Sequence, residues 1–107
     1  MNSQYPPFIQ SLKKHDPELY KVVTEGHNLI MESGALDVKT KLLIALAVDA
    51  FAGSTGVKSI ANAARNVGAT EAEIAEALRL AYYVAGNKAL FTAMAAFENN
   101  QPEKTNG

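Results

Sequence analysis

Few residue types in this chain can do chemistry, and cysteine is not among them. The 107 residues contain no cysteine and two histidines, His15 and His27. Thiolate nucleophiles, dithiol redox pairs and cysteine metal sites are therefore excluded, because each of them needs a sulfur atom. Two histidines are also too few for a histidine-rich zinc site, so we expect neither a metal nor another cofactor.

Asp49 is the most unusual carboxylate, because it stands in the middle of an apolar stretch. A buried carboxylate must be paired, neutral or functional, and such a group could act as a general acid or base. Its expected partners are Lys58, Arg65 and His27. A place at the exposed end of a helix, or in an ion pair at an interface, is the commoner explanation for such a residue.

His27 is a second candidate general base, provided that its helix borders a cleft. An isolated histidine is more often a surface group or a hydrogen-bonded structural group. Tyr82 and Tyr83 could offer a hydroxyl to a ligand, although a tyrosine pair is more often packed in a core or an interface.

A glycine-rich segment at 53–59 reads GSTGVKS and has the residue types of a phosphate-binding loop. A P-loop needs four residues between its glycines, a lysine directly after the second glycine and a preceding strand, and this segment meets none of these conditions. A weaker alternative is an anion bound by Ser54, Thr55, Lys58 and the first backbone N–H groups of the next helix. Capping of that helix by Ser54 or Thr55 is the commoner role.

Start and stop signals predict that helices position these residues. Asp16, followed by Pro17, opens a helix over 17–32, and Asp37 caps a helix over 38–52. A third helix over 57–67 ends at Gly68, with Ala61 and Ala64 facing inward.

Thr70 and Glu73 form a capping box that opens a fourth helix. Its inward face carries Ile74, Ala77, Leu78 and Ala81. Gly86 is expected to interrupt the pattern, so that 88–97 forms a fifth helix.

No segment alternates polar and apolar residues for long enough to form a strand, so we expect an all-α fold, a compact helical bundle. A length of 107 residues favours one core. We divide the chain into an N-terminal arm at 1–15, a helical domain at 16–98 and a flexible tail at 99–107.

The predicted helix at 38–52 is apolar on every face after its first turn, which is typical of a helix buried all round. So small a protein has too few other helices to cover it fully, so either a partner subunit covers part of it or the fold is very compact. We favour the partner and expect an obligate homo-oligomer. The net charge of -1 gives no field to attract nucleic acid. Since no apolar run is long enough to span a membrane, we expect a cytoplasmic protein with neither nucleic acid nor membrane as a partner.

Two stretches, GALDVKTKLLIALAV at 34–48 and GATEAEIAEAL at 68–78, with Gly86 after them, resemble the carboxymuconolactone decarboxylase and alkylhydroperoxidase D-like family. The resemblance spans about residues 20–97. It implies an all-helical domain that assembles into trimers or hexamers. It also implies small-molecule or peroxide chemistry at a cleft near the subunit interface.

The redox branch of that family carries a glutamate, two cysteines two residues apart and a histidine. This chain places Leu42 at the glutamate position, Gly53 and Gly56 at the cysteine positions and Ile60 at the histidine position. Thiol peroxidase chemistry is therefore excluded. The decarboxylases of the family keep a histidine near the position of Ile60, so Ile60 argues against that activity as well.

Our first hypothesis is a homo-oligomer, a trimer or hexamer, that binds a small acidic organic molecule at a cleft between subunits. Asp49, His27, Ser54, Thr55 and Lys58 are its candidate residues. A second hypothesis is a structural protein whose former active site is packed shut, and the residues at the four redox positions fit it slightly better. A third is a non-redox decarboxylase or isomerase that uses Asp49 and His27.

Overall fold

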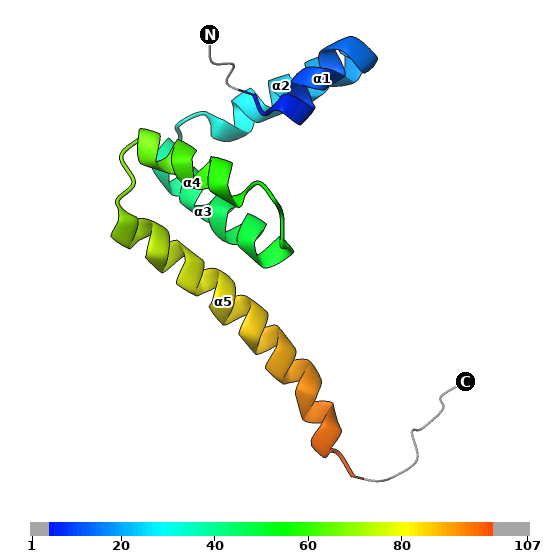
Figure 1. Cartoon of the computed structure of the whole chain (residues 1–107), viewed down its shortest axis with the longest axis vertical. Coiled ribbons are helices and arrows are strands. Elements are labelled where there is room, and N and C mark those ends of the chain that lie inside the picture. Colours follow the sequence, from blue (N-terminus) through cyan, green and yellow to red (C-terminus); the bar gives the residue numbers. More distant parts are fainter. Residues whose placement is uncertain (1–4, 100–107) are drawn as a thin grey trace, which may run out of the picture. The chain divides into compact units, whose positions relative to one another are not determined.

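The computed structural model describes residues 5–99, and within them the protein is helical, with no strand (Figure 1). The prediction of an all-α fold is confirmed. The chain divides into two compact units, 1–41 and 42–107. In chain order the elements are the α-helices α1 (Pro7–His15), α2 (Pro17–Met31), α3 (Val38–Ala52), α4 (Val57–Asn66) and α5 (Glu71–Ala93), and the 3-10 helix η1 (Met94–Phe97).

In the first unit, α1 and α2 form a hairpin joined by Asp16. The predicted cap is confirmed, because Asp16 Oδ1 accepts the backbone N–H of Leu19 at 3.0 Å. Tyr5, just before α1, lies beside the later part of α2. Its hydroxyl donates to Asn28 Oδ1 at 3.0 Å, and its ring meets the ring of Tyr20 edge to face. The start of the segment therefore packs on the helix that follows it.

Two residues hold the end of α2 and the start of α3. Asp37 Oδ1 accepts the backbone N–H of Thr40 at 2.8 Å, which confirms the predicted cap. Hydrogen bonds from Thr40 lower the pKa of Asp37. Lys41 Nζ donates to the carbonyls of Ile30 and Glu32 at 2.7 and 2.5 Å. The ammonium group thus lies at the negative end of the α2 dipole.

The second unit has a core of small side chains around Leu46, which is 0% exposed and is the largest fully buried residue. The buried members of this core come from α3, α4, the turn before α5, and α5 itself. The prediction that Ala61 and Ala64 face inward is confirmed. The other members of the buried cluster are Ala69, Ile74 and Ala77.

The helix α4 ends at Asn66 and, as predicted, Gly68 follows its end, in a Schellman motif. Gly68 has a φ of +100°. Its N–H donates to the carbonyl of Arg65 at 3.0 Å, and the N–H of Ala69 donates to the carbonyl of Ala64 at 2.9 Å. The chain turns here from α4 into α5.

The first turn of α5 carries the predicted capping box. Thr70 Oγ1 accepts the N–H of Glu73 at 3.1 Å, and Glu73 Oε1 accepts the N–H of Thr70 at 2.9 Å. Arg65 reaches across the turn with two hydrogen bonds to Glu71, at 2.7 and 2.9 Å. These bonds lower the pKa of Glu71 and raise that of Arg65.

The predicted interruption at Gly86 is wrong, because α5 runs without a break from Glu71 to Ala93. A glycine inside a helix costs about 1 kcal/mol relative to alanine. The alanines and leucines around it favour helix, and no proline follows within it. The segment expected as a fifth helix is therefore the last part of α5 together with η1. The predicted tail beyond Asn99 lies outside the described residues.

The helices α3 and α5 are covered only in part by their own chain. On α3, Ile44, Val48 and Phe51 are exposed, so one chain does not bury this helix on every face. Tyr82 and Tyr83 are exposed as well, which excludes a core role for them here. No helix in residues 5–99 is long and apolar enough to cross a membrane. On the later part of α5 and on η1 the exposed large apolar residues are Leu90, Phe91, Met94 and Phe97.

Candidate functional site

Apolar packing occupies two of the positions at which the resemblance places redox residues. Leu42 and Ile60 are partly buried and pack against the cluster around Leu46. The resemblance places these two apolar side chains at the positions of the family's glutamate and histidine. Neither side chain can hold or move a proton, so these two positions cannot support the proton transfer that the family's redox chemistry needs.

The other two redox positions lie in the turn between α3 and α4, which suits glycine. Gly53 has a φ of +72°, a conformation that side chains with a Cβ rarely adopt. A Cβ on Gly56 would lie 3.0 Å from Asp49 Oδ2. A cysteine would therefore strain the backbone at 53 and crowd a carboxylate at 56.

Asp49 places its carboxylate at the N-terminal end of α4. Gly56, which its Oδ2 approaches, is the N-cap residue of that helix. The helix dipole favours a negative charge at this end. Of the expected partners, Arg65 binds Glu71 instead, and in residues 5–99 Asp49 forms no ion pair with Lys58. The geometry thus gives Asp49 a structural role in the turn.

Ser54, Thr55 and Lys58 are exposed around the same turn. The expected cap is wrong, because Gly56 is the N-cap residue and no side chain caps α4. Ser54 Oγ instead accepts the N–H of Gly56 at 3.1 Å. An external anion bound here would meet the carboxylate of Asp49, which repels it.

His27 lies on α2, in the first unit, whereas the other candidates lie in the second. Its ring packs edge to face against Tyr5, with 5.2 Å between the ring centroids. Its Nδ1 is buried and, within the described part of the chain, has no hydrogen-bond partner. A general base must reach the proton that it removes, so this packing suits a structural histidine better.

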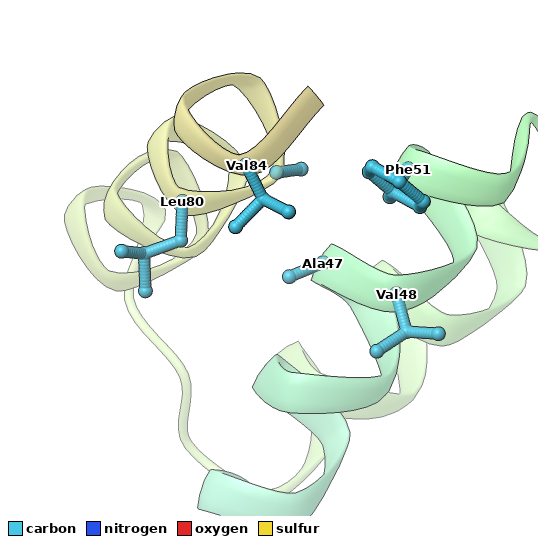
Figure 2. A pocket seen from close by; sticks show the side chains of 6 residues that line it. Ala47, Val48, Phe51, Leu80 and Val84 are labelled. Carbon is cyan, nitrogen blue, oxygen red and sulfur yellow. The ribbon is translucent and has the colours of Figure 1, made fainter. Parts of the chain in front are cut away.

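An apolar groove lies between α3 and α5 within the second unit (Figure 2). Its volume is about 220 Å³. Ala47 and Val84 point into it from opposite helices. None of the side chains predicted for the site lines it. The lining residues are Ala47, Val48, Phe51, Leu80, Ala81 and Val84.

A wider hollow of about 590 Å³ shares Phe51 with this groove. Lys88 and Thr92 line it, together with the alanines at 85, 89 and 93. The ammonium of Lys88 lies 5.7 Å from the centroid of the Phe51 ring, a distance suited to a cation–π interaction. Lys88 is the only charged residue between 80 and 97.

Neither the groove nor the wider hollow beside Lys88 was predicted from the sequence, although one feature of the sequence indicates the hollow. A single lysine in an otherwise uncharged stretch of eighteen residues is unusual for a helix that lies at a protein surface. Among the described residues, no three His, Asp or Glu side chains gather as a metal site would require.

The model of the carboxymuconolactone decarboxylase family matches residues 17–99. No curated protein and no solved structure matches the chain with significance.

Proposed function

Because the chain belongs to the carboxymuconolactone decarboxylase family, we propose that it is a homo-oligomer that binds a small organic molecule in the groove between α3 and α5. The bound molecule is apolar along most of its length. The chain has no cysteine, so thiol peroxidase chemistry plays no part. The proposal does not include catalysis.

The observation that carries the proposal is the groove itself. Its six lining residues are alanine, valine, leucine and phenylalanine, and most binding pockets for small molecules are lined mainly by such side chains. The volume of about 220 Å³ lies below the usual range for drug-sized ligands, which suits a small molecule. The turn at 53–56 is a poorer place for a ligand, because Asp49 already supplies a negative charge there.

Self-association is supported by the apolar surface of α5. Phe91 is 86% exposed and Phe97 82% exposed, which is costly for a lone chain in water. A second copy would cover this surface. We propose a trimer or a hexamer, and an 11.4 kDa monomer at micromolar concentration would contradict it.

The direct test uses octanamide, a neutral probe with an apolar chain, and follows thermal unfolding at a fixed protein concentration. A ligand at ten times its Kd should stabilise the protein by about 1.4 kcal/mol. Val84→Phe adds a large side chain to the groove wall and should abolish the shift. Leu90→Phe, on the same helix but outside the groove lining, is the matched control and should retain it. No shift in the unmodified protein, or an equal shift in both variants, would refute binding in the groove.

A structural homo-oligomer without a ligand is the second candidate function. The packing of Leu42 and Ile60 against the core favours it, since it removes the family's redox relay without replacing it. Native mass spectrometry separates the two functions, because an oligomer with a stoichiometric small mass supports binding and a bare oligomer supports the structural role. A decarboxylase or isomerase that uses Asp49 and His27 has less support, because neither residue lines the groove.

A further inference from the structure

We propose that the groove between α3 and α5 selects a monocarboxylate, with Lys88 as the residue that recognises the acid group. The apolar body of the ligand lies between Ala47 and Val84, and its carboxylate lies in the wider hollow beside Lys88 and Thr92. This inference rests on the proposed function, because it assigns a polarity to the molecule in the same groove.

Lys88 supplies an isolated positive charge. Lys88 is the only charged residue between 80 and 97, and it lines a hollow whose other walls are mainly alanine and phenylalanine. In residues 5–99 it forms no ion pair. Lys88 is exposed to water, and an anion beside it gains a charge-assisted contact that the surrounding apolar side chains do not offer.

Phe51 places this charge beside the groove. Phe51 lines both the groove and the wider hollow, and the ammonium of Lys88 lies 5.7 Å from its ring centroid. This contact holds the positive charge beside the point where the two hollows meet. A ligand whose chain lies along the groove therefore brings its end group to Lys88.

Thr92 supplies a second hydrogen-bond donor beside Lys88. Thr92 follows Lys88 by four residues on α5, so the two side chains lie on the same face of the helix. Both line the wider hollow, and in the described part of the chain the Thr92 hydroxyl has no hydrogen-bond partner. An ammonium and a hydroxyl together provide donors for the two oxygens of a carboxylate.

The number of charges sets the class of ligand. One ammonium pairs with one carboxylate, and the lining of the hollow offers no second cation for another acid group. A phosphate monoester carries more charge and is usually bound by arginine or by several backbone N–H groups. The hollow has neither among its lining side chains. An aliphatic or aryl-alkyl monocarboxylate fits these conditions.

The test compares octanoate with octanamide by isothermal titration calorimetry on the full chain. The two probes share an apolar chain and differ in charge. The unmodified protein should bind octanoate about threefold to tenfold more tightly than octanamide, the range expected for a charge-assisted contact at a partly open site. The preference should shrink at about 0.5 M salt, because the charge on Lys88 is screened there.

Three variants assign the preference. Lys88→Gln should bind both probes equally, and Lys88→Arg should keep the preference because it keeps the charge. Lys58→Gln removes an exposed lysine on α4 that does not line either hollow, so it should behave as the unmodified protein does. Circular dichroism and oligomer size should be unchanged in all three.

The failures of the two proposals are distinguishable. Equal binding of both probes to the unmodified protein, with both lost in Val84→Phe, overturns the acid preference and leaves the groove as the binding site. A preference that persists in Lys88→Gln also overturns the role of Lys88. Absence of binding by either probe overturns both proposals. Dissociation of the oligomer in Lys88→Gln would show that Lys88 pairs with an acidic group of a second copy, and it would overturn the inference.

Discussion

A substitution at Gly53 tests whether the turn between α3 and α4 requires glycine. The resemblance places Gly53 at a cysteine position of the family's redox branch, and its φ is +72°. An added Cβ would meet no atom within 4 Å, so Gly53→Ala introduces no clash. Its effect on stability isolates the backbone conformation.

The expected change in the free energy of unfolding of Gly53→Ala is the sum of two opposing contributions. A residue with a Cβ in the left-handed region costs about 1–2 kcal/mol. Replacement of glycine also reduces the entropy of the unfolded chain, which stabilises the folded state by about 0.4–1 kcal/mol. Gly53→Ala should therefore destabilise the protein by about 1 kcal/mol, or lower its Tm by about 4 °C.

Gly34→Ala is the matched control. Gly34 also has no atom within 4 Å of an added Cβ, but its φ is not positive. This variant should gain about 0.4–1 kcal/mol, since only the effect on the unfolded chain applies. Urea unfolding of both variants at one protein concentration measures the difference. Equal stability of the two variants would refute the claim that the turn requires glycine at 53.

The other predictions concern the core, a cap and an ion pair. Leu46→Ala should cost about 2–5 kcal/mol in urea unfolding, because Leu46 is fully buried; a loss below 1 kcal/mol would place the core elsewhere. Thr70→Ala should cost about 1 kcal/mol through loss of the capping box, and Thr70→Ser should restore most of it. Glu71 has a pKa lowered by the hydrogen bonds from Arg65, so the contribution of this pair is present above the ordinary pKa of 4.5 and is lost as the pH falls through the lower folded value. Urea midpoints from about pH 6 to pH 3 should therefore fall less steeply in Glu71→Gln than in Glu76→Gln, and equal slopes would contradict this assignment.

Local signals in the sequence were enough to predict most helix ends. Asp16, Asp37 and the Thr70–Glu73 box act on backbone N–H groups within three residues, so their effect can be read without the rest of the fold. Gly86 shows the limit of this reasoning. Its cost to a helix is small, and the residues on both sides outweigh it.

The absence of cysteine alone excludes thiol chemistry, whatever the fold, because no arrangement of the other residues can replace sulfur. The place of a ligand could not be predicted in this way. The groove depends on how α3 and α5 pack beyond Leu46, and this is decided by contacts between residues about thirty positions apart. For the same reason, only the tertiary structure shows that Asp49 faces the start of α4 and that Lys88 lies over Phe51.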